Sequence, residues 1–161
     1  MDKKNICIEG QRIKLIPLRE KDATEKYASW INDPEVNKFL STKKTTVKEL
    51  REYIKDHYNN PNSLLLGIFL KESNIHIGNV KLEPIDFKDK IATMGTLIGE
   101  KKFWGKGYAT ETYKSLINYA FNILKLEFID AGLPVGHIGA SKALQNVGFK
   151  TILVREDFIY P

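Results

Sequence analysis

A short segment in the second half of the chain combines glycines with lysines. Residues 99–107 read GEKKFWGKG and directly precede a helical pattern that opens at Tyr108. Gly105 and Gly107 allow the backbone to turn its N–H groups inward, and a helix start adds a partial positive charge of about 0.5. These features predict a binding loop for a phosphate-bearing anion. We call residues 99–107 the glycine loop.

Two common phosphate-binding loops do not match this segment. A dinucleotide-binding loop of the Rossmann type has a third glycine or alanine where this chain has Thr110, and no strand-helix-strand unit precedes it. A P-loop has Ser or Thr after Gly-Lys, whereas Lys106 is followed by Gly107. A bare G-x-G can also simply join a strand to a helix. The motif alone therefore leaves a connector and an anion site both open.

The elements that must position the glycine loop are predicted from hydrophobic spacing. Thr46 and Glu49 form a capping-box signature before a helical face that continues to Tyr58, and Gly148 is placed to end a helix in the left-handed conformation. The mixed order of elements predicts the α+β class. We expect strands at 12–17, 63–70, 75–82, 91–98, 126–131 (buried) and 149–154, and helices at 22–31, 47–58, 141–147 and from Tyr108 onward.

Several segments together resemble one known family. IGEKKFWGKGYATE at 98–111 resembles the acetyl-CoA pyrophosphate loop of the GNAT superfamily of N-acetyltransferases. The superfamily motif Q/R-x-x-G-x-G/A reads KFWGKG at 102–107, with a lysine in the first position. The segments RIKLIPLREKDA, WINDPEV, IGNVKLEPID and HIGASKALQNVGF resemble the ribosomal-protein N-acetyltransferase-like branch, the RimJ/RimL type, and together cover most of the chain.

The resemblance implies the GNAT fold, a mixed central sheet with a splay between strands 4 and 5, flanked by about four helices. The two splayed strands would be 91–98 and 126–131. Acetyl-CoA would lie between them, because backbone groups that are unpaired at the splay can bind its pantetheine amides and polarise its thioester. The residues that the resemblance assigns to the cofactor are Leu97, Ile98, Gly99, Lys102, Phe103, Trp104, Gly105, Lys106, Gly107, Tyr108 and Ala109.

Catalysis would need the acceptor amine in its neutral form, whereas a lysine-like amine has a pKa of ~10.4. The branch often has Glu where this chain has Thr93, and Asn and Ser where it has His137 and Ala140. His137 is our first candidate for the base, because imidazole titrates near ~6.5. Glu100 is the second candidate. A surface histidine and a carboxylate that merely offsets nearby lysines are the alternative interpretations.

Residues at and just after the end of the first predicted helix would overhang the acceptor in this family. Trp30 and Asn32 are therefore candidates for substrate binding, although Trp30 also has the helical spacing of a core residue and Asn32 suits a turn. We expect no metal, since His57, His76 and His137 form no close-spaced ligand pair. The acceptor is left open among amines, with a protein N-terminus or an amino sugar favoured over a polyamine or an antibiotic.

Composition restricts the other classes of function. The chain has 161 residues, enough for one domain at 1–161, and its hydrophobic content of 42% excludes a disordered chain. Cys7 is its single cysteine, no apolar signal opens the sequence, and no apolar run approaches the roughly 20 residues that a membrane span needs. We expect a cytoplasmic protein without a membrane partner. The net charge of +5 suits an anionic ligand, but no nucleic-acid-binding motif accompanies it.

Two further questions concern the assembly and the activity. The chain stops at Pro161, where family members turn into one more strand, so the last strand is predicted to be absent or its place taken in a homodimer. The departures at Thr93, His137 and Ala140 favour an alternative, a catalytically lapsed module that binds CoA or a protein partner. The primary interpretation is an N-acetyltransferase that transfers acetyl from acetyl-CoA directly to a small-molecule or peptide amine.

Overall fold

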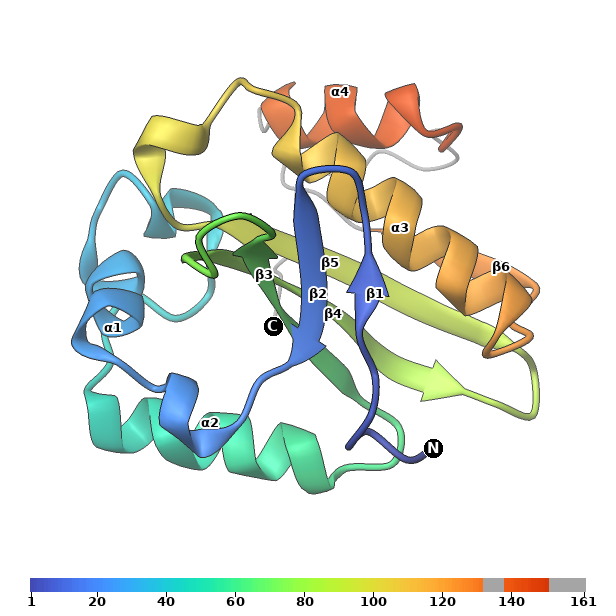
Figure 1. Ribbon diagram of the computed structural model, residues 1–161, viewed down its shortest axis with the longest axis horizontal. Coiled ribbons are helices and arrows are strands. Elements are labelled where there is room, and N and C mark those ends of the chain that lie inside the picture. The colour runs from blue at the N-terminus through green and yellow to red at the C-terminus, as the bar shows by residue number, and fades with distance from the viewer. Residues whose placement is uncertain (132–137, 151–161) are drawn as a thin grey trace.

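A mixed sheet of six strands forms the centre of the protein in a computed structural model that describes residues 1–131 and 138–150 (Figure 1). The strands follow the order of the sequence. All neighbouring pairs are antiparallel except the last, which is parallel. The strands are β1 (Ile8–Glu9), β2 (Ile13–Pro17), β3 (Leu64–Leu70), β4 (His76–Asp86), β5 (Ile91–Ile98) and β6 (Phe128–Asp130).

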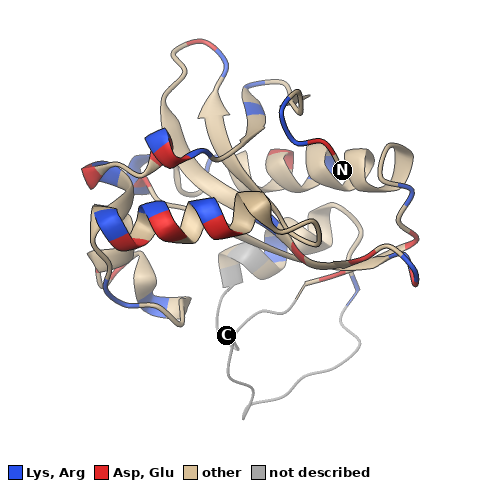
Figure 2. Cartoon of the chain, turned by 90° about the horizontal axis from the view of Figure 1, so that it is seen from below, with Lys and Arg blue, Asp and Glu red and all other residues tan. Residues whose placement is uncertain are grey.

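Helices lie on both faces of this sheet, so the predicted mixed sheet with flanking helices is confirmed (Figure 1). The outward surface of α2 carries charges of both signs, as expected for a helix that is buried on one side only (Figure 2). The helices are α1 (Glu25–Asn32), α2 (Val47–Asn59), α3 (Tyr108–Asn122) and α4 (Ile138–Asn146), with 3-10 turns η1 (Glu20–Asp22), η2 (Asn37–Phe39) and η3 (Lys101–Phe103).

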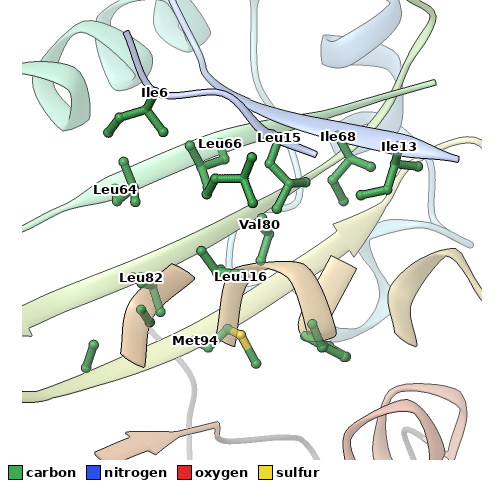
Figure 3. Packing of buried hydrophobic residues seen from close by; sticks show 14 of the residues in the cluster. Ile6, Ile13, Leu15, Leu64, Leu66, Ile68, Val80, Leu82, Met94 and Leu116 are labelled. Atoms are coloured by element: carbon green, nitrogen blue, oxygen red, sulfur yellow. The ribbon is translucent and has the colours of Figure 1, made fainter. Parts of the chain in front are cut away.

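Alternation along β3 divides its side chains between two hydrophobic cores. Leu64, Leu66 and Ile68 belong to the core under α3, whereas Leu65 and Phe69 pack with α1 and α2. This is the two-residue period of a strand that is buried on both faces. In the first core, Leu116 of α3 lies over strand residues that include Val80, Leu82 and Met94 (Figure 3). The sheet that carries the glycine loop is therefore held from both sides.

Side-chain caps decide where two of the helices begin. The Thr46 hydroxyl accepts a hydrogen bond from the Glu49 N–H at 3.1 Å, which confirms the predicted start of α2. The prediction that the first helix opens at Asp22 was wrong. Thr24 is the N-cap and accepts a hydrogen bond from the Tyr27 N–H at 3.2 Å, so α1 begins at Glu25.

The last described elements also differ from the predictions. Strand β6 is shorter than the expected 126–131 and is not buried, because it has a neighbour on one side only among the described residues and leaves Phe128 63% exposed. Helix α4 begins at Ile138, three residues earlier than predicted, and Gly148 follows it with a φ of 99° as expected. The predicted strand 149–154 has no strand conformation at 149–150, and its remainder lies outside the described residues.

Candidate active site

Strand β5 loses its partner on one side halfway along its length. It pairs with β6 from Ile91 to Thr93, opposite Phe128 to Asp130, and no further pair joins the two strands within the described residues. On its other side β5 stays paired with β4 as far as Ile98. The second half of β5 therefore presents unpaired backbone groups along the β6 side in the described part of the chain, as the predicted splay requires.

The glycine loop connects this open strand to α3. Gly105 and Gly107 have φ values of 70° and 84°, a backbone conformation that residues other than glycine rarely adopt. Gly107 is the N-cap of α3 and supplies no side-chain cap, so no side chain of residues 1–131 or 138–150 occupies the first N–H groups of the helix. A Cβ added to Gly105 would meet no atom of those residues within 4 Å. The loop thus offers free donors beside open space, which suits an anion.

The three lysines of the glycine loop differ in their partners. Lys101 pairs with Asp33 at 2.8 Å and with Glu35 at 3.3 Å. The hydrogen bond to Asp33 raises the pKa of Lys101, and the same contact lowers the pKa of Asp33. Lys102 and Lys106 have no carboxylate within 4.0 Å in the part of the chain that the structure describes. Their charge remains available to a ligand, whereas the charge of Lys101 is largely neutralised.

Glu100 is held at the end of β5 by α1. Its Oε1 accepts a hydrogen bond from the Trp30 indole at 3.1 Å and lies 3.9 Å from the Lys26 ammonium. Trp30 is 3% exposed and lies directly against Gly99, where an added Cβ would approach the indole to 2.0 Å. Gly99 is thus needed for this close contact. The arrangement places one oriented carboxylate where the splay ends.

Trp30 and Asn32, the two residues predicted to bind the acceptor amine, both make contacts within the fold. Trp30 packs in the α1–α2 core with Tyr27 and His76, at ring-centroid distances of 5.5 and 4.9 Å. Asn32 exchanges two hydrogen bonds with the backbone of Thr45, at 3.0 and 2.8 Å, and so joins the two ends of the α1–α2 connection. Contacts of either residue with an acceptor stay predictions.

His57 and His76 are both engaged in contacts within the fold. The His76 ring is stacked on Phe69 at 4.8 Å, and burial lowers its pKa. His57 lies 2.8 Å from Glu83 and links α2 to β4. His137, the first candidate for the base, lies outside the described residues.

Five of the eleven predicted cofactor residues also contribute to the hydrophobic cores. Leu97 reaches the α1–α2 core, whereas Ile98, Phe103, Tyr108 and Ala109 pack against the core under α3. The Trp104 indole donates to the Ile98 carbonyl at 2.7 Å, which folds the glycine loop back onto the strand. These contacts fix the loop relative to β5.

A polar group that no sequence pattern predicted lies on the α2 side of the splay. Lys81 is the cross-strand partner of Gly95, and its ammonium lies 3.5 Å from the Tyr53 hydroxyl. No atom of the described residues lies within 4 Å of a Cβ added to Gly95. Paired residues in an antiparallel ladder point to the same face, so Lys81 borders the open space over Gly95. No sequence signal marks this pair, because β4 and β5 had to be in register first.

A mixed sheet that opens between two parallel strands, next to a glycine loop at a helix start, is the arrangement that the GNAT resemblance implies. This chain belongs to the GNAT family, since the family model described as "Acetyltransferase (GNAT) domain" matches residues 12–150. It is 30% identical over 144 residues to the uncharacterized N-acetyltransferase p20 of Bacillus licheniformis. The alignment covers 87% of this chain and 80% of that protein.

Solved structures show the same fold at lower identity. An acetyltransferase of the GNAT family from Bacillus anthracis has a TM-score of 0.79 and 20% identity, covering 90% of this chain and 84% of that one. A spermidine N-acetyltransferase from Vibrio cholerae, in complex with CoA and spermine, has a TM-score of 0.79 and 22% identity, covering 92% and 88%. The protein is therefore an acetyltransferase of a family that uses acetyl-CoA, and its RimJ/RimL branch stays a prediction.

Two further features, a metal-ligating cluster and a membrane-spanning helix, are absent from the part of the chain that the structure describes. Among residues 1–131 and 138–150, no cluster of three or more potential ligands could hold a metal ion. Within the same residues, no helix has the length and apolar character needed to cross a membrane.

Proposed function

We propose that this protein transfers acetyl from acetyl-CoA to a primary amine directly, in a ternary complex. The observation that carries the proposal is the end of β5–β6 pairing at Thr93 and Asp130, followed by the glycine loop at the end of the same strand. One strand thus places open backbone groups and anion donors next to each other. Acetyl-CoA has a thioester on a pantetheine arm and a diphosphate beyond it, and would need both.

The cofactor would be held by backbone groups more than by side chains. The diphosphate would accept hydrogen bonds from the N–H groups at 105–107 and from the start of α3, with Lys102 and Lys106 adding charge. The pantetheine amides would pair with β5 near Leu97 and Ile98, where β6 has left the strand. Glycines with positive φ and unpaired lysines fit this ligand well.

The chemical step forms a C–N bond and breaks the C–S bond of the thioester. A β5 N–H donor would stabilise the oxyanion of the tetrahedral intermediate. The leaving thiolate, with a pKa of ~8.5 by analogy with cysteine, needs little help from an acid near neutral pH. The proton of the attacking amine must go to a base or to water, and Glu100 and His137 are the proposed acceptors.

An acetyl-enzyme is not part of the proposal. Cys7 is exposed and lies just before β1, on a different element from the glycine loop and β5. The acetyl group would therefore pass from sulfur to the acceptor nitrogen without stopping on the protein. A side-chain adduct that forms and decays at the turnover rate would contradict this.

The acceptor would approach over Gly95 from the α1–α2 face. Lys81 borders that space and has no carboxylate within 4.0 Å in the described residues. Its positive charge disfavours a second cationic group on the acceptor and favours the neutral, nucleophilic form of the amine. We therefore favour a protein N-terminus or an amino sugar over a polyamine such as the ligand of the Vibrio cholerae structure.

The proposal is tested by CoA release from acetyl-CoA across a panel of amines, after calorimetry has shown that acetyl-CoA binds. We expect release with amino sugars or N-terminal peptides and little with spermidine. Binding without release for any amine would favour the lapsed module instead. Absence of acetyl-CoA binding would overturn the proposed function altogether.

A further inference from the structure

Arg12, in the first part of the chain, contacts the end of the glycine loop and the first residue of α3. Its Nη1 donates to the Lys106 carbonyl at 3.0 Å, and its guanidinium carbon lies 4.0 Å from the centre of the Tyr108 ring. Its Nη2 would lie 3.4 Å from a Cβ at Gly107. None of the cofactor assignments above includes this residue.

Glu111, one turn into α3, holds the Arg12 side chain in place. Its Oε2 accepts from Arg12 Nε at 2.8 Å, and its Oε1 accepts from the backbone N–H groups of Arg12 and Ile13. Burial by itself would raise the pKa of Glu111, but the hydrogen bonds from Arg12 outweigh it and leave the pKa lowered. The carboxylate is thus an ionised anchor that orients the guanidinium.

The hydrogen bond to the Lys106 carbonyl has a consequence for the next residue. In a trans peptide the C=O and the following N–H point in opposite directions. With the Lys106 carbonyl turned toward Arg12, the Gly107 N–H points away from it. This N–H donates to no protein acceptor in the described part of the chain. It is one of the free donors that the proposed diphosphate site contains.

We propose that Arg12 is a positioning residue for the cofactor, which holds the Lys106–Gly107 peptide so that the Gly107 N–H faces the diphosphate of acetyl-CoA. The inference rests on the proposed function of the glycine loop. Arg12 would act through this peptide and not mainly through its charge, because Nε and Nη1 already have protein partners. A lysine cannot reproduce the role, since one ammonium cannot make the planar, forked set of contacts.

The decisive experiment compares Arg12→Ala and Arg12→Lys with the unchanged protein by calorimetry with acetyl-CoA. A hydrogen bond to a charged group typically contributes about tenfold or more in affinity, so we expect both variants to raise the Kd at least about tenfold. The KM for S-acetylpantetheine, a donor that lacks the diphosphate, should stay within about twofold. A general loss of structure would affect both ligands alike.

Arg19→Ala is the matched control. Arg19 also stacks on a tyrosine, Tyr58, at 4.3 Å, but makes no contact with the glycine loop. We expect this variant to bind acetyl-CoA with unchanged affinity.

Three results would overturn the inference. The first is an Arg12→Ala protein, folded by thermal melting, that binds acetyl-CoA within twofold of the unchanged protein. The second is full affinity for acetyl-CoA in Arg12→Lys, which would show that only the positive charge of Arg12 is needed. If Arg12→Ala does not fold, the affinity of Arg12→Lys alone tests the inference. The third is an equal loss for acetyl-CoA and S-acetylpantetheine. If the unchanged protein fails to bind acetyl-CoA, the proposed function falls and the inference with it.

Discussion

The two halves of β5 have different neighbours and, we propose, different tasks. At Ile91 and Ala92 the strand is paired on both sides, and Ala92 is buried in the core under α3. From Gly95 to Ile98 its only pairing among the described residues is with β4, and its residues are exposed or half-buried. Pairing on both sides along one half holds the strand in place, so backbone groups along the other half can remain unpaired. Stability and ligand binding are thereby separated within a single element.

The largest expected effect is at the end of the open half. Replacing Gly105 and Gly107 together with valine should raise the Kd for acetyl-CoA more than about 100-fold, because valine strains the positive φ and blocks backbone approach to the diphosphate. Calorimetry measures this loss. Gly148→Ala is the control, since Gly148 also has a positive φ but lies after α4. Wild-type affinity in a folded double variant would show that the loop does not bind the cofactor.

The two candidate bases come next. Glu100→Gln keeps an oxygen that can accept from the Trp30 indole but removes the proton acceptor, so we expect kcat to fall ~100-fold if this carboxylate is the base.

His137→Ala should lower kcat by the same factor if the imidazole is the base, with the wild-type rate rising with pH through a value near ~6.5. The acetyl-CoA Kd should change little in either variant. Unchanged kcat in both would leave water as the proton acceptor.

A substitution under the paired half should have the opposite profile. Leu116 is fully buried over Val80, Leu82 and Met94, so Leu116→Ala should lower the free energy of unfolding by about 2 to 5 kcal/mol (Figure 3). Denaturant unfolding measures this change. At a temperature where the variant is folded, its affinity for acetyl-CoA should be unchanged. A large loss of affinity would mean that the two halves of β5 are not separable.

The smallest effects separate the lysines of the glycine loop. Lys106→Ala should weaken acetyl-CoA binding by roughly three- to tenfold, and the difference should shrink at high salt, because an unpaired surface charge is screened. Lys101→Ala should change the affinity less than twofold, since Asp33 and Glu35 already neutralise this residue. Titrations at two salt concentrations compare the variants. Equal losses for both would show that only net charge matters.

The sequence alone was sufficient for the parts of this protein that depend on local chemistry. Hydrophobic spacing and the Thr46 cap located α2, and alternation located β5 at its observed bounds. The glycine loop was visible because positive φ values require glycine and a helix start requires free N–H groups. The start of α1 was misplaced, because the capping bond of Thr24 competes with the helical pattern that begins at Asp22.

Only the tertiary structure decided which residues face one another across the sheet. The Arg12 contact with the Lys106 carbonyl spans 94 positions, and the Lys81–Gly95 pair depends on the register between β4 and β5. Neither pairing leaves a periodic or compositional signal, because each residue alone suits an exposed surface. Local propensities are encoded in neighbouring residues, but the geometry of a site arises from long-range pairing. For that reason the sequence predicted a cofactor loop, and the fold was needed to show which residues hold that loop in place.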